Sequence, residues 1–109
     1  MAIDFSQIEK TSAENFWGGE GTIYMRAFKD DVTKIMLARI EPGCSIGEHT
    51  HTTSEEIVYV LSGKGKTIQD GVEEAMEPGK AYYCPKGHTH TVFNDSDEPM
   101  TMYCVVVNL

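Results

Sequence analysis

The feature that most constrains the fold is a regular alternation of short apolar segments and turn-forming residues. The apolar segments are rich in β-branched and aromatic side chains and cover residues 22–28, 34–41, 56–61, 66–69, 80–84, 89–93 and 101–107. Clusters of Gly, Pro, Asp and Asn separate them, and Asp70-Gly71 suits a two-residue hairpin turn. Turns that recur every ~8–12 residues between short strands are typical of a β-sandwich or barrel. We therefore predict an all-β fold.

The chain is long enough for one domain. It has 109 residues, of which 40% are hydrophobic, so a packed core is feasible. Residues 1–20 are polar and irregular in pattern, whereas strand patterns fill the rest. We expect an N-terminal segment over 1–20, irregular or covering a dimer interface, followed by a β-barrel domain over 21–109.

Composition excludes several classes of partner. The net charge of −8 disfavours binding to nucleic acid or to anionic membrane surfaces. No apolar run approaches the ~20 residues of a membrane span, and the first ten residues lack the apolar stretch of a secretory signal. The three cysteines are widely spaced, which indicates reduced thiols rather than disulfides. We expect a cytoplasmic protein.

Two segments are apolar on both faces. Residues 57–61 and 104–107 do not alternate between apolar and polar side chains, as a barrel strand with one solvated face should. Their outer face must therefore be covered. Two explanations stay open: the N-terminal segment covers it, or a second copy does so in a homodimer.

The histidines indicate a metal site. All four lie in two identical triplets, His49-Thr50-His51 and His88-Thr89-His90. In extended chain, alternate side chains point the same way, so each triplet presents two imidazoles on one side. A carboxylate, Glu55 or Glu56, follows the first triplet. Imidazole and carboxylate together suit divalent transition metals. Spacing alone leaves open which glutamate coordinates and whether His88 does.

Two stretches resemble the conserved motifs of the cupin superfamily. Residues 43–63 follow the first motif, G-x5-H-x-H-x3–4-E-x6-G, and residues 79–94 follow the second, G-x5-P-x-G-x2-H-x3-N. The resemblance covers about half of the chain and implies a small single-domain cupin with a double-stranded β-helix, or jelly-roll, barrel.

The resemblance also implies roles for individual residues. The metal ligands are His49, His51, Glu56 and His90. They would hold one divalent transition metal, with Fe, Mn, Ni, Co and Zn all open. If Glu56 faces inward, Val58 and Val60 do too, and with Met102 they are expected to line the pocket. His88 and Glu55 are candidates for groups beside the ligands, with no catalytic residue assigned. The remaining motif residues are expected to shape turns: Gly43, Gly63, Gly79, Pro85, Gly87 and Asn94.

A cupin fold admits several functions. We expect a metal-dependent enzyme that acts on a small organic molecule in a dioxygenase- or decarboxylase-like reaction. The alternatives are a non-catalytic, metal-containing binding or sensor module, a sugar isomerase- or epimerase-like cupin, and a purely structural cupin. Sugar phosphates need several cations near the metal, and the chain has only nine Lys and Arg in total. Two or more of them facing the site would favour the isomerase alternative.

Overall fold

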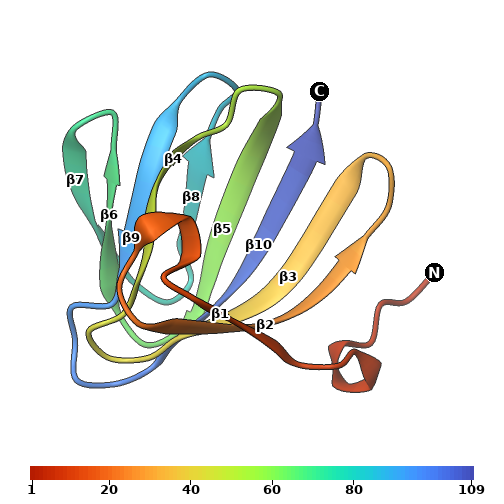
Figure 1. Ribbon diagram of the computed structural model, residues 1–109, viewed down its shortest axis with the longest axis horizontal. Coiled ribbons are helices and arrows are strands. Elements are labelled where there is room, and N and C mark those ends of the chain that lie inside the picture. The colour runs from red at the N-terminus through yellow and green to blue at the C-terminus, as the bar shows by residue number, and fades with distance from the viewer.

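Ten antiparallel strands and two short 3-10 helices make up the computed structural model, which describes residues 1–109 (Figure 1). The helices are η1 (Phe5–Gln7) and η2 (Phe16–Gly18). The strands are β1 (Thr11–Glu14), β2 (Thr22–Lys29), β3 (Thr33–Ile40), β4 (Ser45–Thr50), β5 (Ser54–Ser62), β6 (Gly65–Gln69), β7 (Val72–Met76), β8 (Ala81–Cys84), β9 (Thr89–Phe93) and β10 (Met100–Asn108).

The strands form two sheets that face each other. The larger sheet has the order β1-β2-β3-β10-β5-β8, and the smaller has the order β4-β9-β6-β7. Figure 1 shows the smaller sheet on the left and the β2–β3 hairpin on the right, with the interior between them. All pairings are antiparallel, and from β3 onward the chain crosses between the two sheets at every connection except the β6–β7 hairpin. The predicted all-β jelly-roll fold is confirmed.

The core lies between the sheets because each central strand turns alternate side chains inward. On β5, Glu56, Val58 and Val60 are buried, while the intervening side chains are exposed. A cluster of twelve buried residues forms the core: Ile23, Met36, Ala38, Ile40, Ile46, Val58, Val60, Met76, Val92, Met100, Met102 and Cys104. It fills one end of the barrel and leaves the other open for a site.

The N-terminal segment contacts the barrel in two places. On the outer face of the larger sheet, the Phe5 ring packs 5.4 Å from the Tyr103 ring, and the Arg26 guanidinium donates to the carbonyls of Phe5 and Ile8. Further along, β1 pairs with β2 and η2 lies against β4. The segment therefore adds an edge strand and part of the wall at the open end.

One apolar part of the outer face stays uncovered by the N-terminal segment. Ile57, Tyr59 and Leu61 on β5 are 39–42% exposed, and Tyr83 on the adjacent β8 is 52% exposed. Of the two open explanations, coverage by residues 1–20 does not hold for residues 57–61, because the segment contacts Tyr103 on β10 and leaves these side chains exposed.

All seven predicted strands are present, with ends shifted by at most two residues. The Asp70-Gly71 hairpin also forms, with positive φ at both residues. Three strands were not predicted: β1, β4 and β7. No helix of the structure is long and apolar enough to cross a membrane.

Candidate metal centre

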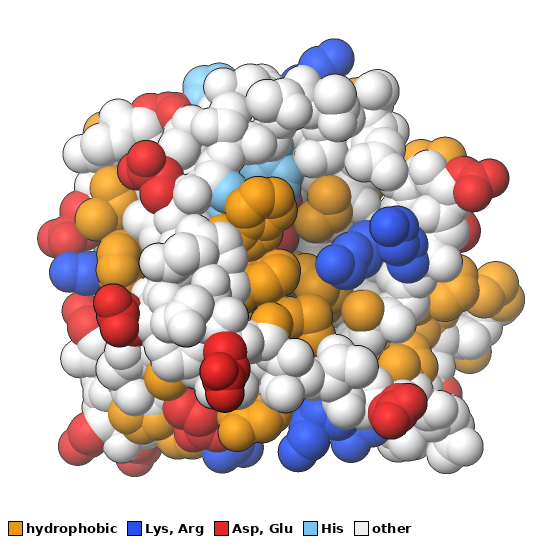
Figure 2. All heavy atoms as spheres, viewed as in Figure 1, with side chains coloured by type: hydrophobic (Ala, Val, Ile, Leu, Met, Phe, Trp, Pro, Cys, Tyr) orange, Lys and Arg blue, Asp and Glu red, His pale blue; other side chains and the backbone are white.

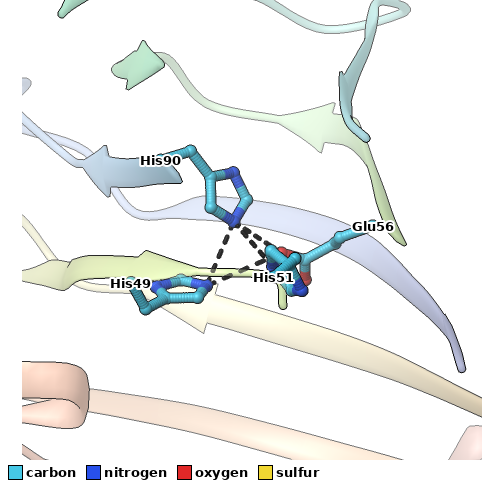
Figure 3. A group of neighbouring side chains, drawn as sticks. All are labelled: His49, His51, Glu56 and His90. Carbon is cyan, nitrogen blue, oxygen red and sulfur yellow. Dashed lines mark hydrogen bonds and ion pairs between the residues drawn. The ribbon is translucent and has the colours of Figure 1, made fainter. Parts of the chain in front are cut away.

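Two facing sheets bring the four candidate ligands to one point. His49 and His90 are direct cross-strand partners on β4 and β9 of the smaller sheet. His51 follows the end of β4, and Glu56 comes from β5 of the larger sheet. Figure 3 shows the four side chains converging from these separate elements. The barrel thus brings together residues that are far apart in the sequence, and their donor atoms all lie within 4.8 Å of one another.

The three imidazoles present Nε2 to a common centre. His90 Nε2 lies 3.1 Å from His49 Nε2, 3.1 Å from His51 Nε2 and 2.8 Å from Glu56 Oε1. His51 Nε2 is 3.1 Å from the same carboxylate oxygen, and His49 Nε2 is 4.0 Å from it. Several lone pairs aimed at one point repel each other unless protons or a cation lie among them.

These separations fit an octahedral cation. A metal–ligand bond of about 2.1 Å places adjacent octahedral ligands about 3.0 Å apart and opposite ones about 4.2 Å apart. Of the separations that join these atoms, four are 2.8–3.1 Å, and the one between His49 Nε2 and Glu56 Oε1 is 4.0 Å. Tetrahedral ligands would be separated by about 3.4 Å, which describes the set less well. If His49 and Glu56 are the one opposite pair, the two remaining octahedral positions are adjacent.

Neighbouring groups orient two of the rings. His49 Nδ1 donates to the Gly47 carbonyl at 2.8 Å, which puts the ring proton on Nδ1 and leaves the Nε2 lone pair facing the centre. His51 Nδ1 is hydrogen-bonded to the Ser54 hydroxyl at 2.8 Å. Such partners fix ring orientation and raise the affinity of metal sites.

The electrostatics also favour a charged ligand set. Burial raises the pKa of Glu56, but the hydrogen bonds from His51 and His90 and the nearby His49 imidazole outweigh it and hold that pKa well below its usual value. Burial lowers the pKa of His49, while the nearby Glu56 carboxylate and the hydrogen bond to the Gly47 carbonyl outweigh burial and raise that pKa. Glu56 is therefore ionised at neutral pH and supplies the negative charge that a divalent cation needs.

The four side chains sit in the wall of a cavity of about 280 Å³. Figure 2 looks into the open end, where imidazole atoms lie at the base of a hollow lined by hydrophobic side chains. The Trp17 ring stacks on His49 with centroids 5.2 Å apart and planes 16° apart. The apolar lining residues are Phe16, Trp17, Met36, Ile46, Val58, Val92, Cys104 and Val106. The remaining lining residues are Lys34, the four candidate ligands, Thr50, Thr52, Thr53 and Ser54.

The other candidate pocket residues lie in different places. Val58 lines the cavity, whereas Val60 and Met102 are fully buried in the core beyond it. His88 lies outside the cavity, with Nδ1 2.5 Å from Asp70 Oδ2 on the surface. Glu55 also points outward, where its carboxylate accepts a hydrogen bond from the Tyr83 hydroxyl.

The backbone angles and hydrogen bonds show where the expected turn residues of the two motifs lie. Gly43, Gly63, Gly79 and Gly87 all have positive φ, between 77° and 87°. Pro85 precedes a turn closed by a bond from the His88 N–H to the Pro85 carbonyl. Asn94 is buried and donates to the carbonyls of Ile40 and Glu98, while its side-chain oxygen accepts from Ser96.

The cavity residues that sequence reasoning missed include Trp17, Lys34 and Cys104. A signal was available for two of them. Lys34 lies two residues before buried Met36 on β3, and Cys104 lies two residues after buried Met102 on β10. Each therefore shares the inward face of its strand. Trp17 carried no periodic signal, because it lies in a short 3-10 turn with positive φ.

Arg26 and Arg39 do not line the cavity; Arg39 pairs with Glu41 on the surface.

The fold and the site together define a jelly-roll β-barrel with a three-histidine, one-glutamate cluster at its open end. The sequence matches the cupin domain family over residues 36–106, and the chain belongs to this family.

Comparisons with individual proteins agree with this assignment. An oxalate-binding protein from Thermotoga maritima is 24% identical over 115 aligned residues, covering 100% of this chain and 95% of that protein. A crystal structure from the same organism, described as a predicted oxalate decarboxylase, has a TM-score of 0.93 at 23% identity and covers 100% of both chains. A sugar phosphate isomerase of the cupin superfamily from Silicibacter pomeroyi has a TM-score of 0.82 at 22% identity, covering 100% of this chain and 76% of that one. At these identities the likeness establishes the fold.

Proposed function

We propose that this cupin holds one divalent transition metal through His49, His51, Glu56 and His90 and takes up a small carboxylate for decarboxylase- or dioxygenase-like turnover. The observation that carries the proposal is the donor set itself, whose separations of 2.8–4.0 Å suit an octahedral ion. A bound metal would polarise a ligand oxygen or activate oxygen.

The carboxylate class is favoured by the shape of the site. Two adjacent open positions suit a molecule with neighbouring oxygen donors, such as oxalate. The cavity of about 280 Å³ suits a ligand of only a few atoms. The T. maritima relative is named for oxalate binding and aligns with the whole chain, which supports the same ligand class here.

The charge of the cavity disfavours a sugar phosphate. Lys34 is the only Lys or Arg among the lining residues. A phosphate of charge near −2 is normally held by several cations or backbone N–H groups. The condition under which the isomerase alternative gains support, two or more cations facing the site, is not met.

Binding without turnover is the second candidate. Apart from Glu56, no carboxylic acid lines the cavity. A decarboxylation that must return a proton to the product lacks an obvious acid among these side chains, other than the Lys34 ammonium. This observation favours a binding or sensing role over a decarboxylase in particular.

The two candidates separate in one experiment. The protein is stripped with EDTA, reloaded with Mn²⁺, Fe²⁺, Co²⁺, Ni²⁺ or Zn²⁺ in turn, and titrated with oxalate in a calorimeter. Parallel samples are assayed for formate, CO₂ and oxygen consumption. Metal-dependent oxalate binding with product supports the enzyme. Binding without product supports the binding module, and loaded protein that binds no oxalate rejects the carboxylate class.

We also infer that two copies pair through the exposed part of the larger sheet. The apolar surface of Ile57, Tyr59, Leu61 and Tyr83 supports this inference, because the chain itself leaves it open. Light scattering over a dilution series should give a dimer mass for the wild type and a monomer mass for Ile57→Glu. A monomer mass for wild type at all concentrations would reject the dimer.

A further inference from the structure

We propose that Lys34 is the anion anchor of the cavity, pairing with the carboxylate oxygens of a metal-bound dicarboxylate that point away from the metal. The proposal rests on the metal-carboxylate function proposed above and names a residue that discriminates between ligands by charge.

The strand register places Lys34 opposite the metal cluster. Lys34 on β3 pairs with Val106 on β10, and Val106 pairs with Glu56 on β5. Direct cross-strand partners point to the same face of a sheet. Glu56 points into the barrel, so Lys34 does too, two strands away, which is about 10 Å between backbones. A flexible four-carbon side chain spans much of that gap, and a small ligand fills the rest.

The Lys34 ammonium has no carboxylate partner of its own. None of the ion pairs in the structure includes it. Its charge nevertheless affects the pKa of a buried thiol inside the barrel. Burial raises the pKa of the Cys104 thiol well above its usual value, Glu56 raises it further, and Lys34 acts in the opposite direction. Lys34 is thus an unpaired cation that faces the cavity.

The surroundings make a single inward cation decisive for anion binding. The chain carries a net charge of −8, so the mean field repels a dianion. Apart from Lys34 and the four candidate ligands, the cavity walls are apolar or hydroxyl-bearing, and an ion pair strengthens where water is excluded. Figure 2 shows Lys or Arg atoms at the edge of the hollow, across from the imidazoles.

The chain offers a matched control in Lys29. It is the direct β2 partner of Lys34 and carries the same charge one strand further from Glu56. Lys29 is exposed and does not line the cavity. Replacing it changes the net charge by the same amount and leaves the Lys34 side chain in place.

The test compares full-length wild type, Lys34→Gln, Lys34→Arg and Lys29→Gln, each loaded with Mn²⁺ and checked for metal content. Calorimetry gives the Kd for oxalate and, as a neutral metal ligand, for imidazole. Loss of one charged hydrogen bond weakens binding by about tenfold or more. We expect that loss for oxalate in Lys34→Gln, retained affinity in Lys34→Arg and Lys29→Gln, and unchanged imidazole binding and metal content throughout.

Several results would overturn the assignment. Lys34→Gln could bind oxalate as wild type does, Lys29→Gln could lose as much affinity, or imidazole binding could fall in step with oxalate. Wild type that binds Mn²⁺ and imidazole but no oxalate rejects the anchor and the carboxylate class together. Wild type that takes up no metal rejects the metal-carboxylate function as a whole.

Discussion

Gly47→Ala tests whether the N-terminal segment forms the cavity wall. A Cβ on Gly47 would lie 2.0 Å from the Trp17 carbonyl oxygen and 2.7 Å from the Gly19 nitrogen, both backbone atoms. Ordinary contact begins at 3.4 Å, so the η2 backbone must withdraw by about 1.4 Å. Overpacking of this kind costs about 1–3 kcal/mol. The withdrawal would also break the stack of Trp17 on His49, whose centroids are 5.2 Å apart.

Two assays follow the change. Urea unfolding measured by far-UV circular dichroism should show a free energy of unfolding lower by about 1–3 kcal/mol. Trp17 is the only tryptophan, so quenching of its emission by bound Co²⁺ or Cu²⁺ reports its distance from the cluster, and we expect weaker quenching in Gly47→Ala.

Gly43→Ala is the control for this substitution. Gly43 has φ of +77° and no atom within 4 Å of a Cβ, so alanine there adds about 1–2 kcal/mol of backbone strain without moving Trp17. Gly47→Ala with wild-type stability and wild-type quenching would refute the close packing of η2 on β4.

Three further predictions concern single side chains. Ser54→Ala removes the hydroxyl partner of His51 Nδ1 and should weaken metal affinity about tenfold to a hundredfold, measured by competition with a chelator; unchanged affinity would contradict it. Asn94→Ala leaves the buried Ile40 carbonyl without its donor and removes part-buried bonds to Glu98 and Ser96, and it should cost about 1–3 kcal/mol, measured by urea unfolding. Burial, with smaller effects of Glu56 and Asp70, raises the pKa of Cys84 to about 11. Its alkylation by iodoacetamide, followed by mass spectrometry, should therefore be negligible at pH 8 and rise only as the pH nears about 11; rapid reaction at pH 8 would refute this.

The strands that could be predicted from the sequence are those in which apolar side chains mark a buried face. β5 and β10 carry apolar residues at every inward-facing position of the core because both lie inside the larger sheet. The unpredicted strands lack this signal for physical reasons. β7 is an edge strand with mostly exposed side chains, and β1 is likewise an edge strand. β4 is interrupted in its pairing with β9 between Ile46 and His49, and its polar sequence reflects the cluster it carries.

Periodicity indicated two histidine pairs and a neighbouring glutamate, and the resemblance to the cupin motifs selected His49, His51, Glu56 and His90, which the structure brings together. The opposite wall was not predicted. The face shared with Met36 turns Lys34 inward, but its place opposite the cluster depends on β3 and β5 flanking β10 in one register, and such long-range pairing leaves no mark in a single sequence. His88 shows the converse: its triplet with His90 suggested a shared site, but it turns outward to Asp70.

The most direct test of the central claim is metal analysis of wild type and His51→Ala, purified without chelator and again after EDTA treatment and reloading. His51 Nε2 lies 3.1 Å from both Glu56 Oε1 and His90 Nε2, so its removal opens the ligand shell. The account predicts about one equivalent of a divalent transition metal per wild-type chain, removable by EDTA, and a steep loss of metal in His51→Ala. Wild type that takes up no metal, or His51→Ala that holds metal equally well, would contradict it.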